Sequence, residues 1–123
     1  MAARTRSLVA FAHVADVARS IRFYADLGFS VASSVVPDGG SAPTWAWLES
    51  DGANLMVGLA DAPVDAAVQA VLFYLYVDDV RQAYEQLRAL GHAPGSIAHP
   101  FYMPAGEFRL EDPDGYVLML AQC

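Results

Sequence analysis

Two side chains of this sequence, His13 and Glu49, have the chemistry for proton transfer. An imidazole exchanges a proton near neutral pH, and a carboxylate or a tyrosine can act as its partner. The same two groups with a tyrosine would also give a rearranged metal site, if all three met in ligand geometry. A histidine on an apolar strand is often a core residue, so a structural role for His13 stays open beside a ligand-contacting one.

Aromatic side chains with polar tips form a second group suited to ligand contact. Such side chains offer apolar area together with one directed hydrogen bond, although core or interface positions would explain them equally well. The loop 99–104, which contains Phe101 and Tyr102, would either fold over the ligand as a lid or pack against the sheet edge. The aromatic residues that alternate along predicted strands are Trp45, Trp47, Tyr74 and Tyr76.

Composition limits the partners of the chain. Its 123 residues are 55% hydrophobic, which is enough for one domain spanning residues 1–123. The formal net charge of -7 disfavours nucleic acid and anionic membrane surfaces, and it would attract a cationic ligand. The first apolar run is interrupted at His13 and Asp16, so we expect no signal peptide or membrane span and a cytoplasmic location. The single cysteine, Cys123, allows no internal disulfide and no cysteine-based metal site.

A repeat divides the chain into two halves. Turn residues and apolar residues recur 63 positions later, and no gap is needed to align them. The repeat predicts two modules, residues 7–60 and residues 70–123. Matched pairs include Asp16 with Asp79, Gly28 with Gly91, Gly52 with Gly115, and Met56 with Met119.

Each module is predicted to contain a strand, a helix and three further strands. The helices begin after Asp16 and Asp79, whose carboxylates can cap them, and they stop at Gly28 and Gly91. This order predicts an α+β fold, in which two tandem βαβββ modules form a curved mixed sheet. The predicted strands cover residues 8–14, 29–36, 43–49 and 53–59 in the first module, and 71–77, 92–98, 107–112 and 116–121 in the second.

Alternation along the first strand of each module predicts which face could bind a ligand. Phe11 and His13 point away from the helix of the first module, and Tyr74 and Tyr76 point away from the helix of the second. A curved sheet would form a concave cleft on that face.

The strand 107–112 does not fit this pattern. The repeat matches Trp45 with Phe108 and Trp47 with Leu110, yet Arg109 and Glu111 then lie on the opposite face. The strand could therefore be a sheet edge, and its facing is left unassigned.

Two segments resemble the signature segments of the glyoxalase/bleomycin-resistance/dioxygenase (vicinal oxygen chelate) superfamily. The first is Val14-Ala15-Asp16-Val17, continuing through Phe23-Tyr24 to Leu27-Gly28-Phe29; the second is Phe108-Arg109-Leu110-Glu111-Asp112-Pro113-Asp114-Gly115-Tyr116. With the repeat, the resemblance spans nearly the whole chain and implies the paired βαβββ fold. The superfamily contains isomerases, dioxygenases, thiol transferases and non-catalytic drug-sequestering proteins, so the fold alone does not decide the function.

Enzymes of this superfamily hold a divalent metal with His, Glu or Gln side chains on four strands. The corresponding positions here carry Val9, Met56, Leu72 and Met119. Valine and leucine have no donor atom, and thioethers prefer soft Cu(I). The resemblance therefore implies no metal or other cofactor, and it is closest in character to the bleomycin-resistance-type binding proteins, which are acidic homodimers. His13 falls where glyoxalase I enzymes carry a substrate-binding arginine, which implies a ligand contact.

We expect a homodimer that sequesters an aromatic or cationic natural product, such as an antibiotic, without altering it. The alternative is a lyase or isomerase of the same superfamily that uses His13 as acid or base, with Glu49 or a tyrosine as its partner. A third possibility is a structural dimer whose aromatic faces are buried between subunits. The expected ligand contacts are Phe11, His13, Trp45, Trp47, Met56, Tyr74, Tyr76, Phe101, Tyr102 and Met119.

Overall fold

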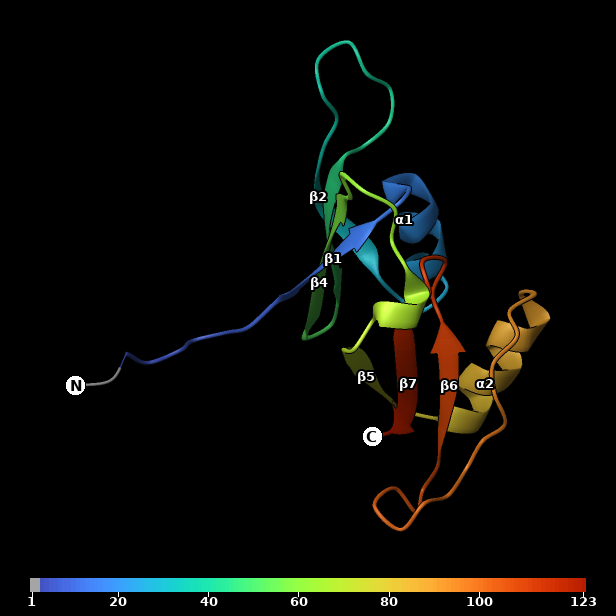
Figure 1. Cartoon of the computed structure of the whole chain (residues 1–123). Helices are drawn as coiled ribbons and strands as arrows, with labels where there is room; N and C mark the ends of the chain where they lie inside the picture. The colour runs from blue at the N-terminus through green and yellow to red at the C-terminus, as the bar shows by residue number, and fades with distance from the viewer. Residues whose placement is uncertain (1–2) are drawn as a thin grey trace. The chain divides into compact units, whose positions relative to one another are not determined.

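The computed structural model describes residues 3–123, which divide into two compact units. The first unit ends at Val64 and the second begins at Asp65. Each unit contains one α-helix and one mixed β-sheet (Figure 1). Across residues 3–123, no helix combines the length and the hydropathy needed to cross a bilayer.

The first unit has a four-stranded sheet in the order β1-β4-β3-β2. Strand β1 pairs with β4 in parallel, and the other neighbours pair antiparallel. The Pro- and Gly-rich loop 36–44 projects beyond the ends of β2 and β3 (Figure 1). The elements are β1 (Ala10–Val14), α1 (Val17–Ala25), β2 (Ser30–Val35), β3 (Trp45–Ser50) and β4 (Ala53–Leu59).

The second unit has a three-stranded sheet in the order β5-β7-β6. Strand β5 pairs with β7 in parallel, and β6 pairs with β7 antiparallel. Helix α2 lies beside β6 (Figure 1). The elements are the short 3-10 helix η1 (Ala66–Val68), β5 (Leu72–Val77), α2 (Val80–Ala89), β6 (Glu107–Glu111) and β7 (Val117–Gln122).

Capping residues set the ends of both helices as predicted. An Oδ1 atom of Asp16 accepts the backbone N–H of Arg19 at 3.0 Å, and Asp79 accepts the N–H of Gln82 at the same distance. After each helix the chain reverses at a glycine with positive φ, 91° at Gly28 and 95° at Gly91. Glycine adopts this conformation without the steric cost that a Cβ atom would bring.

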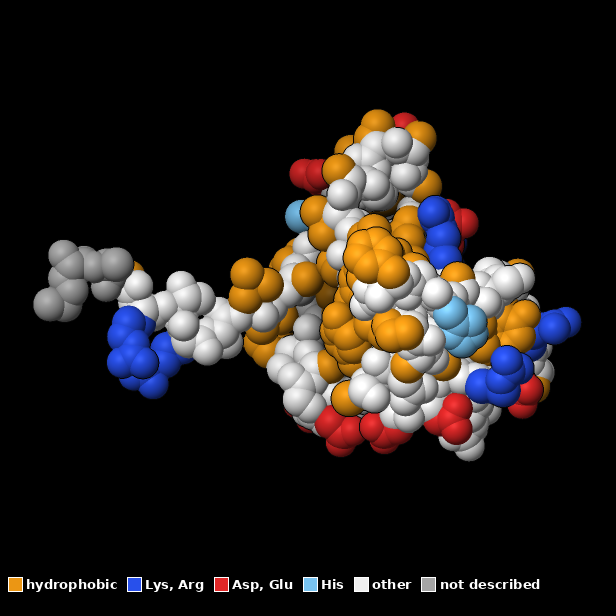
Figure 2. Space-filling view, turned by 90° about the horizontal axis from the view of Figure 1, so that it is seen from below, with side chains coloured by type: hydrophobic (Ala, Val, Ile, Leu, Met, Phe, Trp, Pro, Cys, Tyr) orange, Lys and Arg blue, Asp and Glu red, His pale blue; other side chains and the backbone are white. Residues whose placement is uncertain are grey.

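The core of each unit lies between its helix and one face of its sheet. Each large aliphatic or aromatic side chain buried there stabilises the folded unit by about 1.5–3 kcal/mol. This burial holds the helix on that face of the sheet. Other hydrophobic side chains remain at the surface, where Figure 2 shows them in orange. The buried hydrophobic residues are Ala12, Val14, Val17, Tyr24, Phe29, Ala46, Leu48, Leu55 and Val57 in the first unit, and Val80, Leu87, Phe108, Leu110, Leu118, Leu120 and Ala121 in the second.

The predicted α+β fold is confirmed, with the strands in two mixed sheets, but the predicted strand at 92–98 is wrong. In the second unit this segment makes a single bridge between Ala98 and Glu107. Its backbone also donates from Gly95 to the carbonyl of Arg109, at 2.8 Å. The two contacts are three positions apart on this segment but two positions apart on β6. In addition, Pro94 has no N–H to donate, so a regular ladder cannot form.

The gap-free alignment of the two modules is also wrong at one hairpin. Glu49 pairs with Asn54 five positions later, whereas Glu111 pairs with Val117 six positions later. The turn in the second unit is therefore one residue longer. On β6 the residue equivalent to Trp47 is consequently Arg109, and not the Leu110 that the constant offset indicated.

Candidate functional site

Five of the predicted ligand contacts share the face of the first sheet that points away from α1. The strand registers place Phe11, Met56 and Trp47 in one row across the sheet, with His13 and Trp45 two strands apart in the next row. All five are exposed or half-buried, whereas their neighbours along the strands are buried under the helix. The first open face consists of Phe11, His13, Trp45, Trp47 and Met56.

A missing side chain shapes the middle of the first open face. Gly58 lies between His13 and Trp45 in the sheet, and a Cβ atom there would lie 2.3 Å from Cζ of Phe11. The Phe11 ring thus occupies the space above the bare backbone of β4. It also contacts the His13 ring, with 5.0 Å between the ring centroids. This arrangement gives β1 and β4 a surface made of aromatic rings.

The tryptophans of β3 complete the first open face. Both are half-buried. The indole Nε1–H of Trp47 donates to Oδ1 of Asn54 on the neighbouring strand, at 3.0 Å. This hydrogen bond fixes the orientation of one ring.

The structure does not bring His13 and Glu49 together. His13 and Trp45 are both aligned with Gly58, whereas Glu49 is aligned with Asn54, four residues away. Two strand spacings across the sheet and four residues along it separate the backbones of His13 and Glu49 by about 16 Å. A proton transfer between them needs hydrogen-bond contact, so Glu49 cannot serve as the acid–base partner of His13 within this unit.

The second sheet also has an open face, which points away from α2. Tyr74, Met119 and Arg109 form one row across β5, β7 and β6, and Tyr76 lies in the next row. The rings of Tyr74 and Tyr76 are stacked, with centroids 6.1 Å apart. The second open face consists of Tyr74, Tyr76, Glu107, Arg109 and Met119.

A buried carboxylate, Glu107, links two tyrosines on the second open face. The hydroxyl of Tyr74 donates to Oε1 of Glu107 at 3.4 Å, and the hydroxyl of Tyr102 donates to Oε2 at 3.2 Å. Burial and the nearby carboxylate raise the pKa of Tyr74 above its ordinary value. For Tyr102 the negative charge of Glu107 is the main cause of the raised pKa, and burial is the second. Both phenols are therefore neutral donors at physiological pH.

The loop 99–106 brings Tyr102 to this network. Turn hydrogen bonds order the loop, among them Met103 N–H to the carbonyl of Pro100 at 2.9 Å. Phe101 packs edge-on against the Tyr102 ring and is 95% exposed. Tyr102, and not Phe101, therefore contacts the second open face.

Side chains without hard-metal donors occupy the positions at which the resemblance expects metal ligands. Met56 lies between Phe11 and Trp47, and Met119 has the equivalent central place on the second open face. Val9 immediately precedes β1, and Leu72 begins β5. Within the described part of the chain, no group of three or more His, Cys, Asp or Glu side chains could hold a metal ion.

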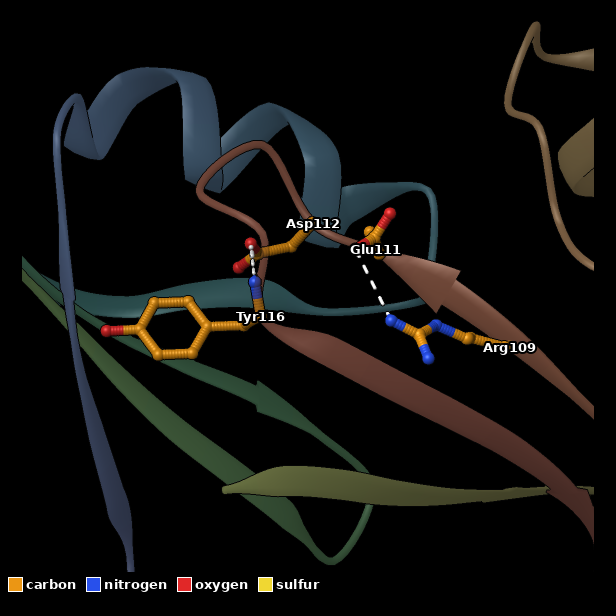
Figure 3. A network of polar contacts seen from close by, with 4 residues as sticks. All are labelled: Arg109, Glu111, Asp112 and Tyr116. Carbon is orange, nitrogen blue, oxygen red and sulfur yellow. Dashed lines mark hydrogen bonds and ion pairs between the residues drawn. The ribbon is translucent and has the colours of Figure 1, made fainter. Parts of the chain in front are cut away.

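Glu107 was not among the residues singled out from the sequence. The structure now assigns the facing of β6: Phe108 and Leu110 are buried toward α2, so Glu107, Arg109 and Glu111 lie on the open face. Arg109 pairs with Glu111 at 3.4 Å and not with Glu107 (Figure 3). Alternation along β6 alone would have predicted that Glu107 and Arg109 share a face. The constant repeat offset instead matched Phe108 and Leu110 with the two tryptophans, so the facing was left unassigned.

A protein-family model and several solved structures match this chain. The family model of the Glyoxalase/Bleomycin resistance protein/Dioxygenase superfamily matches residues 8–120. The comparison with curated proteins gave no match.

Solved structures with the same fold include three proteins with antibiotic-related names. A bleomycin resistance determinant encoded on the transposon Tn5 superposes with a TM-score of 0.78 at 20% identity, over 96% of this chain and 98% of that one. A bleomycin-binding protein complexed with bleomycin gives 0.76 at 20% identity, over 97% and 99%. TnmS3, an antibiotic-binding protein from Streptomyces sp. CB03234, gives 0.73 at 23% identity, over 99% and 98%.

Proposed function

The chain belongs to the Glyoxalase/Bleomycin resistance protein/Dioxygenase superfamily, and from this premise we propose that it binds a small organic molecule. The ligand is an aromatic or cationic natural product, such as an antibiotic, which is held without a metal and released unaltered. One observation carries the proposal: both open faces present rings and a central thioether where the enzymes of the superfamily carry metal ligands.

The physical basis of binding is stacking on exposed rings. A ligand ring placed on an exposed aromatic side chain gains about 0.5–1.5 kcal/mol beyond the area that it buries. Burying about 200 Å² of apolar surface adds about 5 kcal/mol before the cost of association. The unbranched side chains of Met56 and Met119 can adapt to ligands of irregular shape. The bleomycin bound to one similar protein supports this class of ligand.

Intrinsic fluorescence tests the proposal, because both tryptophans of the chain, Trp45 and Trp47, lie on the first open face. We expect saturable quenching when the protein is titrated with aromatic and cationic natural products, bleomycin included. A Phe11→Ala variant should weaken the binding about fivefold by removing one stacking ring. The control is Leu90→Ala, which removes an exposed side chain at the end of α2. Unchanged fluorescence with every compound at submillimolar concentration would contradict the proposal.

Homodimerisation is part of the same proposal. Edge strand β2 exposes Val31 and Val35, and edge strand β5 exposes Leu72 and Tyr76. A monomer rarely leaves this much apolar side chain on sheet edges uncovered. Sedimentation should therefore give a species of twice the 13.2 kDa chain mass. A purely monomeric species at micromolar concentration would be the contrary result.

A further inference from the structure

We propose that Glu107 binds a positively charged nitrogen of the ligand on the second open face. The inference rests on the proposed function and narrows the ligand class. The ligand would carry an ammonium or guanidinium group next to an aromatic or apolar part.

The Glu107 carboxylate is buried, and its hydrogen bonds are long. Glu107 is 4% exposed, and its partners are two neutral hydroxyls at 3.4 and 3.2 Å. A strong hydrogen bond from a hydroxyl to a carboxylate is shorter, about 2.5–2.7 Å. Burying a carboxylate with weak neutral partners is costly, and an opposite charge in contact with it offsets this cost.

Within the described residues, Glu107 has no cationic partner. No Arg, Lys or His among residues 3–123 forms an ion pair with Glu107. The nearest candidate by position on the strand, Arg109, extends toward Glu111 instead (Figure 3). A structural role for Glu107 would favour an internal cation, so the missing charge is better explained by a ligand.

Aromatic rings lie near the carboxylate on the second open face. Tyr76 and Glu107 lie in the same row of the sheet, on either side of Ala121, which is fully buried. The stacked rings of Tyr74 and Tyr76 can hold a cation on their faces. A cationic ligand would thus contact a carboxylate and aromatic rings together, and a neutral ligand would use only the rings.

Tyr102 controls access to the carboxylate. It belongs to the loop 99–106, and it is 58% exposed although its hydroxyl donates to Glu107. Each carboxylate oxygen has two acceptor sites, so a ligand N–H can add beside the tyrosine hydroxyl or replace it. Replacement exchanges a neutral donor for a charged one, and the total number of hydrogen bonds is kept.

A matched pair of probes tests this inference. Phenethylamine is protonated at neutral pH, and 2-phenylethanol has the same ring with a neutral hydroxyl. We expect the wild-type protein to bind the amine about tenfold more tightly in an NMR titration, because a charge-assisted hydrogen bond is the stronger one. Glu107→Gln should reduce this preference to less than about twofold. Glu85→Gln, which removes the same charge from an exposed position on α2, should leave the preference unchanged.

A measurement on the unmodified protein covers the case in which Glu107→Gln does not fold. The side-chain carboxyl carbon of Glu107 should shift on addition of the amine and not of the alcohol. The inference is overturned by equal affinities in the wild-type protein, by a preference that survives Glu107→Gln, or by no binding of either probe at about 10 mM. Equal affinities would leave the proposed function standing, which the fluorescence titration decides separately.

Discussion

Replacing Gly115 by alanine should destabilise the second unit strongly, for two reasons that can be separated. Gly115 has a φ of 88°, where an alanine costs about 1–2 kcal/mol. A Cβ atom there would also lie 2.2 Å from Cβ of Ala66, closer than a normal contact by about 1.3 Å. Relieving this overlap should cost a further 1–3 kcal/mol or so, giving a total of about 2–5 kcal/mol.

Two comparison variants isolate the two contributions. Gly91 has a similar φ of 95°, but nothing lies within 4 Å of a Cβ atom added there. Gly91→Ala should therefore lower the free energy of unfolding only by the cost of the backbone conformation, about 1–2 kcal/mol. Adding Ala66→Gly to the Gly115→Ala variant removes the clashing atom and should restore about 1–3 kcal/mol. The assay is urea unfolding followed by far-ultraviolet circular dichroism. Equal destabilisation by Gly91→Ala and Gly115→Ala, with no rescue in the double variant, would refute the packing of η1 on this turn.

Two further predictions concern the open faces. Glu107→Gln should lower the pH at which Tyr74 and Tyr102 ionise, as followed by tyrosinate absorbance, because the carboxylate raises both pKa values. Folding raises the pKa of both phenols above their ordinary value of about 10, so they contribute their full share of the free energy of unfolding below about pH 10. This contribution is lost as the pH rises through the pKa values of the folded state. An unchanged titration curve would disagree with the network. Gly58→Ala should push the Phe11 ring off β4 and change the chemical shifts of the His13 ring, at a stability cost of about 1 kcal/mol; unchanged shifts would disagree with that contact.

The sequence predicted most of the fold because local patterns determine it. Capping aspartates and positive-φ glycines marked both helices, and alternation identified the open side of β1 and β5. The segment 92–98 was misjudged because its strand identity was inferred from the repeat, whereas Pro94 and the uneven contacts with β6 prevent a ladder.

The sequence predicted less of the candidate site than of the fold. Strand alternation predicted that Phe11, His13, Tyr74 and Tyr76 point away from the helices, and the strand registers place them on those faces. The contact of Tyr102 with Glu107 joins a loop to a strand, and no periodic pattern predicts such a contact. The separation of His13 from Glu49 depends on the register of three strands, which the sequence does not specify.

Native mass spectrometry tests the central claim most directly. The protein, treated with a chelator, would be mixed with a panel of metal-free aromatic and cationic natural products. We expect a complex whose mass equals that of the protein plus one or more intact ligands, without a metal ion, and release of the ligand unchanged. A complex that forms only with a bound divalent ion, or a released compound of altered mass, would contradict it.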